Sequence, residues 1–220
     1  NLPLLHYNEA MPIWLVHRLI FCPCQILLDR VSGKGYNHRA GLKKAAMSSQ
    51  PKPCILFTRD EIEAAVKRLA AEIKRDYYGK QPILIGVLKG SFMFMADLVR
   101  LLDFPLEVEF IRLSSYGRGR ESSGKIKVVQ GLRSEVKGRD VLVIEDIVDT
   151  GLTISFLLDY LRKKKPASLK LCALTDKPSR RQTPVTIDYL GFTVPDKFLV
   201  GYGLDWDEEF RNLPDICVVE

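Results

Sequence analysis

The sequence contains no histidine after residue 38. Its three histidines, His6, His17 and His38, all lie within the first 50 of 220 residues. If the remaining residues form an enzyme, its acid–base groups must therefore be Asp, Glu, Lys or Tyr. Cysteine is also scarce, and the Cys22-Pro-Cys24 run lacks a second pair or a histidine at metal-binding spacing. We therefore expect no zinc site and no requirement for an oxidising compartment.

The sequence also lacks a convincing membrane segment. The most apolar stretch near the N-terminus, residues 13–28, is interrupted by His17, Arg18, Pro23 and Gln25. It is short for a bilayer span and has no cationic segment before it, as a signal peptide would have. Residues 1–50 are open to three interpretations: an extension without specified structure, a targeting or anchoring segment, or a docked arm. Met47 is a plausible start. We expect a cytoplasmic protein without a membrane partner.

The chain after residue 50 carries no concentrated positive charge. The net charge is +6, but the first 50 residues carry six Lys/Arg against two Asp/Glu, and the other 170 carry 27 against 25. A nearly neutral domain is poor evidence for nucleic-acid binding, so we expect no such partner. With 46% hydrophobic and 27% charged residues, we divide the chain into an extension, 1–50, and one globular domain, 51–220.

The most informative stretch runs from Val141 to Ser155. Val141 to Ile144 are uninterrupted apolar residues, which predicts a strand buried on both faces of a parallel sheet. Two acids, Glu145 and Asp146, follow directly, and then a turn over residues 149–153. Apolar residues at helical spacing come next: Ile154, Leu157, Leu158 and Leu161. The order predicts an α/β fold with helices flanking a central sheet.

A strand, a glycine-containing turn and a helix start form an anion site, because backbone N–H groups and the helix dipole point there. Thr150 and Thr153 add hydroxyl donors. Acidic side chains beside a phosphate site need an explanation, since their negative charge would repel the phosphate. Carboxylates accept hydrogen bonds from sugar hydroxyls and bind Mg²⁺, which neutralises a pyrophosphate. A phosphorylated sugar meets both requirements.

Two lysines are placed where ligands of open α/β sheets bind. Lys89, next to Gly90, follows an apolar strand over residues 83–88, and Lys177 follows another over residues 169–174. From the residues alone, Lys89 could equally be a surface lysine. The polar, glycine-rich residues 114–124 follow a third predicted strand, 106–113. They fit either a flexible hairpin loop or a lid that excludes water from a reacting centre.

The segment Glu-Asp-Ile-Val-Asp-Thr-Gly-Leu-Thr, residues 145–153, resembles the phosphoribosyl-pyrophosphate signature of type I phosphoribosyltransferases, most closely the bacterial-like hypoxanthine-guanine branch. The resemblance covers roughly Leu56 to Val219, with matches in at least five places in the expected order. It implies a central, mostly parallel sheet flanked by helices, a small hood and a flexible lid loop. Ser115 and Tyr116 match the mobile-loop pair of this family.

The resemblance implies the following roles. The signature, with Ile147 and Val148, binds ribose phosphate, and the 5′-phosphate lies at Asp149, Thr150, Gly151, Leu152 and Thr153. Glu145 and Asp146 meet the ribose hydroxyls directly or through Mg²⁺, and Asp205 helps to hold a second Mg²⁺. Lys89, Gly90 and Arg211 contact pyrophosphate, with a non-proline cis peptide often found at the Leu-Lys step. Lys177 donates to the purine oxygen, Phe198 stacks on the ring, the backbones of Leu199 and Asp205 read its edge, and Lys197 braces this segment.

The implied activity joins hypoxanthine or guanine to 5-phosphoribosyl pyrophosphate, giving IMP or GMP and pyrophosphate in purine salvage. Asp149 is our candidate general base near purine N7. We expect a homodimer or homotetramer, as is usual in the family. Two rivals remain: a non-enzymatic regulator on the same fold that binds nucleic acid, and a transferase for xanthine or a pyrimidine. Preference between hypoxanthine and guanine stays open, because the discriminating contacts would be main-chain.

Overall fold

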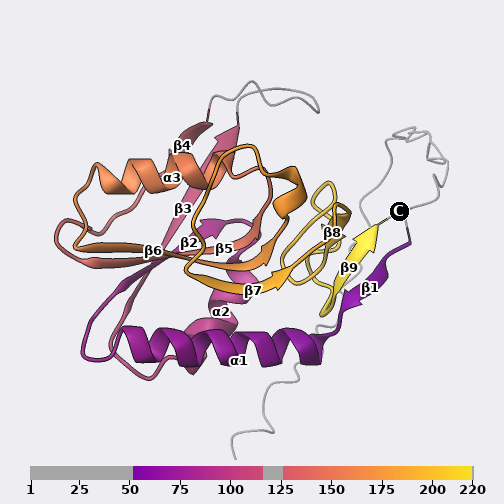
Figure 1. The fold of residues 1–220 in the computed structure, drawn as a ribbon, viewed down its shortest axis with the longest axis horizontal. Coiled ribbons are helices and arrows are strands. Elements are labelled where there is room, and N and C mark those ends of the chain that lie inside the picture. Colours follow the sequence, from indigo (N-terminus) through magenta and orange to yellow (C-terminus); the bar gives the residue numbers. More distant parts are fainter. Residues whose placement is uncertain (1–51, 116–125, 220) are drawn as a thin grey trace, which may run out of the picture. The chain divides into compact units, whose positions relative to one another are not determined.

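The structure is a computed structural model that describes residues 52–115 and 126–219 (Figure 1). The predictions for residues 1–50, for Tyr116 and for most of the lid loop lie outside these ranges. The elements, in chain order, are β1 (Cys54–Phe57), α1 (Arg59–Asp76), β2 (Ile83–Leu88), α2 (Phe92–Leu101), β3 (Glu107–Ser115), β4 (Ile126–Gln130), β5 (Asp140–Val148), α3 (Leu152–Arg162), β6 (Ser168–Asp176), the 3-10 helix η2 (Pro178–Arg180), β7 (Tyr189–Thr193), β8 (Phe198–Val200) and β9 (Ile216–Val219).

Six of these strands form the central sheet, in the order β4-β3-β2-β5-β6-β7. Strands β3, β2, β5, β6 and β7 run parallel, and β4 pairs antiparallel with β3 at one edge. This confirms the predicted α/β fold with a mostly parallel sheet. Because parallel strands end at the same edge, the residues that follow β2, β5 and β6 lie near one another.

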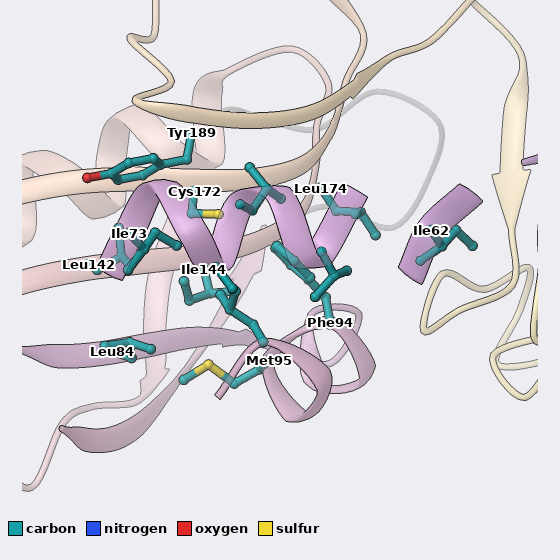
Figure 2. Close-up of a cluster of buried hydrophobic side chains, with 14 of the residues drawn as sticks. Ile62, Ile73, Leu84, Phe94, Met95, Leu142, Ile144, Cys172, Leu174 and Tyr189 are labelled. Atoms are coloured by element: carbon teal, nitrogen blue, oxygen red, sulfur yellow. The ribbon is translucent and has the colours of Figure 1, made fainter. Parts of the chain in front are cut away.

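Helices cover both faces of this sheet, with α1 and α2 on one face and α3 on the other (Figure 1). Successive residues of β5 alternate between the two layers, because side chains of a strand point alternately to opposite faces. Leu142 and Ile144 pack against Phe94 and the α1 side chains shown in Figure 2. Val141 and Val143 pack against Leu157 and Leu161 of α3. Burial on both sides explains why the strand reads as an uninterrupted apolar run.

Helix α1 begins with a capping box formed by Thr58 and Glu61. The Thr58 N–H donates to Glu61 Oε2 at 2.8 Å, and the Glu61 N–H donates to Thr58 Oγ1 at 3.4 Å. These two bonds satisfy backbone donors that the first helical turn leaves unpaired. The buried residues Ile62, Val66, Leu69 and Ile73 then place one stripe of the helix against the sheet.

A second, three-stranded antiparallel sheet has the order β1-β9-β8. It is the small hood that the resemblance implied, and it stands beside the strand ends in Figure 1. Strand β8 ends at Val200, because Gly201 and Tyr202 adopt positive φ values of 93° and 49°. The chain turns there and continues into the loop that leads to β9.

The prediction for β5 was too short. The strand does not end at Ile144 but continues to Val148, because its ladder with β6 continues through the pairs Glu145↔Ala173 and Val148↔Asp176. Glu145 and Asp146 therefore lie within the strand rather than after it. None of the helices within the described ranges has the length and apolar character that crossing a bilayer requires.

A polar cluster ties the end of α1 to the sheet. Asp76 Oδ2 accepts hydrogen bonds from Lys170 Nζ at 2.9 Å and from the Tyr189 hydroxyl at 2.7 Å. Lys170 and Tyr189 come from β6 and β7, so the carboxylate joins three elements. Hydrogen bonds from Lys170 and Tyr189 hold the pKa of Asp76 below its usual range.

We expect Asp76→Ala to lower the free energy of unfolding by about 1–3 kcal/mol at pH 7, because two partners lose a charged acceptor. Urea denaturation measures this change. Asp103→Ala is the matched control: its carboxylate is 77% exposed and pairs with Lys74 alone, so removal should cost less than about 1 kcal/mol. Equal losses in the two variants would contradict a special role for the cluster.

The same pair of variants gives a pH test. A carboxyl group whose pKa is lowered by folding stabilises the folded state above its unfolded pKa of about 3.9, and this contribution is lost as the pH falls below that value. The difference between wild type and Asp76→Ala should therefore narrow from pH 7 to pH 3. A constant difference would show that the carboxylate charge does not contribute.

Candidate active site

The candidate site lies at the carboxyl edge of the central sheet. Lys89 follows β2, the acids lie near the end of β5, and Lys177 follows β6. The Leu88–Lys89 peptide bond is cis and not followed by proline, as the resemblance implied. Ser115 is the last residue of β3 and pairs with Ile126 of β4. The sheet topology thus brings together segments that are separated by up to 88 residues in sequence.

The two acids of β5 occupy opposite faces of the sheet, because they are adjacent residues of one strand. Glu145 lies on the α3 side and lines a cavity there. Asp146 lies on the α2 side, where a Cβ added to Gly90 would stand only 1.7 Å from Asp146 Oδ2. Only glycine at position 90 leaves room for this carboxylate. The acids therefore serve two neighbouring subsites rather than one.

Both acids are buried without enough positive charge beside them. Burial raises the pKa of Glu145 well above its usual value, and the charge of Asp146 raises it further. Burial also raises the pKa of Asp146 to about 6, opposed by backbone hydrogen bonds and by the nearby Arg211 guanidinium, while Asp205 adds to the rise. Glu145 Oε2 is buried and has no hydrogen-bond partner among the described residues. Such a site favours donors or a cation supplied by a ligand.

The predicted anion-binding turn surrounds a cavity of about 240 Å³. It is lined by the signature itself: Glu145, Ile147, Val148, Asp149, Thr150, Gly151, Thr153 and Ile154. Gly151, the N-cap residue before α3, has a φ of +83°, and a Cβ there would meet the Thr183 carbonyl at 2.4 Å. The Gly151 N-cap has no side chain to bond the first-turn N–H groups, and the Leu152 N–H donates to Thr150 Oγ1 at 3.4 Å. The turn can therefore hold a phosphate.

Asp149 faces an arginine that the sequence analysis did not assign. Arg180 Nε lies 3.3 Å from Asp149 Oδ1, and Arg180 Nη1 lies 3.8 Å from Asp196 Oδ1. The backbone of the turn is fixed by hydrogen bonds: the Thr150 carbonyl accepts from the N–H groups of Gln182 and Thr183 at 2.9 and 3.1 Å. Asp149 is therefore held at the junction of the cavity and the segment after β6.

Lys177 is buried, with 5% of its surface exposed. Its Nζ donates to the Lys197 carbonyl at 2.7 Å, and its backbone N–H donates to the Val148 carbonyl at 3.0 Å. The ammonium group is thus fixed between the end of β6 and the segment before β8. The Lys197 carbonyl, rather than the charge of that lysine, is the contact that joins the two segments.

Phe198 begins β8 and leaves 50% of its surface exposed. Its ring meets Trp206 edge-on, with centroids 4.7 Å apart and planes at 62°. An exposed aromatic ring held this way offers a face to a flat ligand. Leu199 buries its side chain, and β8 is an edge strand whose outer backbone groups can meet a ligand.

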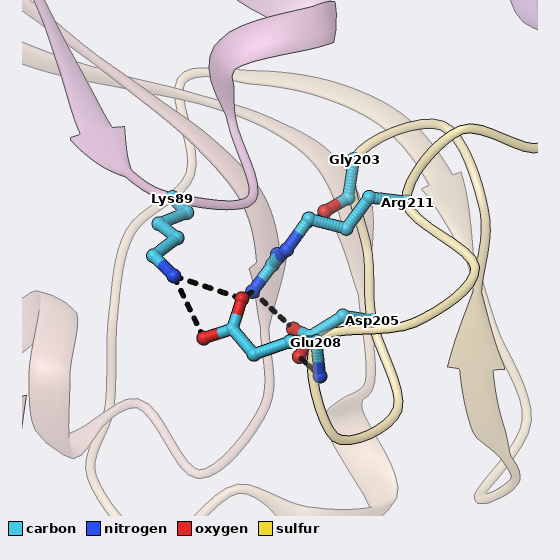
Figure 3. Close-up of polar contacts among 5 residues, drawn as sticks. All are labelled: Lys89, Gly203, Asp205, Glu208 and Arg211. Atoms are coloured by element: carbon cyan, nitrogen blue, oxygen red, sulfur yellow. Dashed lines mark hydrogen bonds and ion pairs between the residues drawn. The ribbon is translucent and has the colours of Figure 1, made fainter. Parts of the chain in front are cut away.

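Four charged residues form a compact group beside the Lys89 turn (Figure 3). Lys89 Nζ lies 2.7 and 2.8 Å from the two Glu208 carboxylate oxygens. Arg211 Nη2 lies 2.7 Å from Asp205 Oδ1 and 3.3 Å from Glu208 Oε2. The sequence analysis assigned Lys89, Asp205 and Arg211 but missed Glu208, since no local pattern indicated that it reaches a lysine 119 positions away.

The protein alone does not form a complete metal cage: the described ranges contain no group of three or more His, Cys, Asp or Glu residues arranged to hold an ion. The donor set nevertheless fits Mg²⁺, because Glu145 offers an unpartnered buried carboxylate oxygen and Asp146 is a second buried carboxylate. Mg²⁺ is commonly bound by one or two carboxylates together with substrate phosphates. Asp205 is tied to Arg211 and would have to exchange partners to bind a metal.

Comparisons with known proteins identify the family of the chain. A family model described as a phosphoribosyl transferase domain matches residues 56–207. A hypoxanthine-guanine phosphoribosyltransferase of Aquifex aeolicus is 50% identical over 167 residues, which cover 76% of this chain and 94% of that protein. One from Bacillus subtilis is 48% identical over 166 residues, covering 76% of this chain and 92% of that protein.

A crystal structure of a hypoxanthine-guanine phosphoribosyltransferase from Bacillus anthracis aligns with a TM-score of 0.74 and 44% sequence identity, covering 78% of this chain and 100% of that one. The family model matches more than half of the chain, and the relatives are similar over nearly their whole length. The chain therefore belongs to the phosphoribosyltransferase family, in its hypoxanthine-guanine branch.

Proposed function

We propose that this chain transfers the 5-phosphoribosyl group of phosphoribosyl pyrophosphate to hypoxanthine or guanine, releasing pyrophosphate and forming IMP or GMP. The observation that best supports this proposal is that two different subsites lie next to each other at one edge of the sheet. The cavity at the start of α3 is lined by the 149–151 turn and Thr153, and also by Glu145, whose buried Oε2 has no hydrogen-bond partner among the described residues. A ribose phosphate supplies the anion for the first and hydroxyl donors for the second.

The reaction passes through a ribose with oxocarbenium character. The 149–153 turn holds the 5′-phosphate and so fixes the ring relative to β5. Glu145 and Asp146 then place negative charge near the sugar, where positive charge develops. Glu145 or Asp146 would hold one Mg²⁺ beside the ribose hydroxyls, and Asp205 would help to hold a second; the bound ions would neutralise charge on the pyrophosphate. The acids orient the ribose hydroxyls in either case.

The leaving group is bound on the α2 side. Lys89 and Arg211 supply positive charge, and Gly90 lets the backbone approach an anion closely because it has no side chain. Asp146 lies against Gly90, so this subsite adjoins the ribose acids. The pyrophosphate charge that develops as the glycosidic bond breaks is therefore met by two fixed cations.

The base binds between β6 and β8. Lys177 has three donors and uses one on the Lys197 carbonyl, which leaves its ammonium group able to donate to the exocyclic oxygen of a 6-oxopurine. Phe198 stacks on the ring, and the backbones of Leu199 and Asp205 read its edge. Asp149 accepts the proton from N7, and Arg180 holds the Asp149 carboxylate toward this position.

A substrate panel tests the proposed activity. With labelled hypoxanthine, guanine, xanthine and uracil, we expect turnover of the first two to exceed that of uracil by at least about 100-fold, because Lys177 and β8 match a 6-oxopurine. EDTA should abolish turnover, and added Mg²⁺ should restore it. Preferred turnover of uracil or xanthine would reassign the base, and no turnover of any base would contradict the proposal.

We expect Asp149→Asn to lower kcat by about 10²–10⁴-fold, since an amide cannot accept the N7 proton. Binding of phosphoribosyl pyrophosphate, measured by calorimetry, should change by less than about threefold, because the turn remains intact. Asp159→Asn, an exposed acid of α3 paired with Arg162, is the control. Unchanged kcat in Asp149→Asn would remove Asp149 from the mechanism.

We expect Lys177→Ala to raise KM for the purine by about 10–100-fold, which corresponds to the loss of one hydrogen bond to a charged group. KM for phosphoribosyl pyrophosphate should change far less. Lys137→Ala, which removes an exposed lysine elsewhere, controls for the change in net charge. A thermal melt run alongside detects loosening of β8, and an unaltered KM for the purine in a folded variant would refute the assignment.

A further inference from the structure

Glu208 lies where an anionic ligand of Lys89 and Arg211 would lie. Both of its carboxylate oxygens contact Lys89 Nζ, and Oε2 also contacts Arg211 Nη2 (Figure 3). The carboxylate therefore bridges two cations that come from distant parts of the sequence. Two oxygens held between a lysine and an arginine are the arrangement that such cations also offer to a phosphate group.

The loop that carries Glu208 is held in a costly conformation. Asp207, Glu208 and Phe210 have φ values of 50°, 69° and 69°, a region that disfavours residues with side chains. The conformation is fixed by reciprocal hydrogen bonds between Trp206 and Glu209 and by the Glu208 N–H, which donates to Asp205 Oδ2 at 2.9 Å. Backbone strain of this kind concentrates at functional sites. Here its result is to direct Glu208 toward Lys89.

The contacts of Glu208 can be exchanged at low cost. Its side chain is 63% exposed, and Lys89 is 44% exposed. Ion pairs this accessible to water contribute little to folding, so stability does not require the pair. Arg211 is held independently by Asp205 and by the Gly203 carbonyl, to which its Nη1 donates at 2.7 Å. A ligand that displaces Glu208 would therefore find Arg211 already in place and would take over the contacts of Lys89.

We propose that Glu208 is an internal competitor of pyrophosphate, which occupies the shared contacts of Lys89 and Arg211 and is displaced when pyrophosphate binds. This inference rests on the proposed function, in which these two cations bind the leaving group. The carboxylate returns as the product departs, so it lowers the affinity for pyrophosphate and speeds its release. Glu208 is thus a positioning residue that sets product affinity without taking part in bond making or breaking.

The test compares Glu208→Gln with wild type, using inorganic pyrophosphate as the probe. An amide of the same size keeps the loop but removes the charge that competes for the cations. A competitor that closes the site for part of the time weakens apparent affinity by the fraction of open sites. We therefore expect pyrophosphate, measured as a product inhibitor in the presence of Mg²⁺, to bind about 3- to 10-fold more tightly to Glu208→Gln.

Asp207→Asn is the matched control, because Asp207 is an exposed acid of the same loop and its replacement changes the net charge equally. Its effect on pyrophosphate affinity should stay below about twofold, as expected for screened charge. A purely structural role for Glu208 would lower the melting temperature and weaken binding. Unchanged or weaker pyrophosphate binding by a folded Glu208→Gln variant would overturn the proposal.

Lys89→Ala separates this inference from the proposed function. Lys89→Ala should weaken pyrophosphate binding in the wild-type background, and it should remove most of the gain produced by Glu208→Gln, because the two residues act on each other. If Lys89→Ala has no effect, the assignment of the pyrophosphate subsite itself fails. If it weakens binding while Glu208→Gln changes nothing, only the role of Glu208 fails.

Discussion

The structure depends on placing two adjacent carboxylates at the buried end of a central strand. Glu145 and Asp146 retain 7% and 9% of their surface exposed, and the pKa of each is raised by burial. Burying a carboxylate without a partner is costly, so folding alone gives no reason for these residues. The cost is offset only if a ligand brings hydroxyl donors or a cation to this place. The rest of the sheet edge is arranged around that requirement.

Because side chains alternate along a strand, the Glu145-Asp146 dipeptide contributes one carboxylate to each of two subsites. Glu145 faces the α3 layer and the cavity around the 149–153 turn, while Asp146 faces the α2 layer and Gly90. The backbones at Gly90 and Gly203 approach each other closely, because glycine has no side chain. A Cβ on Gly203 would lie 2.1 Å from the Gly90 carbonyl oxygen. This contact and the β2–β5 ladder hold the proposed phosphate and pyrophosphate subsites at a fixed spacing.

The sequence predicted features that depend on local pattern. The buried strands and the glycine turn at 149–153 follow from neighbouring residues, and the structure contains them. It did not predict that β5 extends through Glu145 and Asp146, because acids disfavour a buried strand and only pairing with β6 overrides this. Nor did it predict Arg180 against Asp149 or Glu208 against Lys89, since those contacts depend on how loops from different strands meet.

These contacts share one electrostatic principle. Lys89 pairs with Glu208 and Arg211 with Asp205, so both cations assigned to the leaving group meet acids of the same edge. Arg180 forms a further pair with Asp149. This explains how a site for a highly charged substrate can occur in a domain that is nearly neutral overall. Ligand binding then exchanges one set of ion pairs for another instead of burying new unpaired charge, which lowers its desolvation cost. Glu145 differs, because its Oε2 has no partner in the described part of the chain, and the ligand must complete that position.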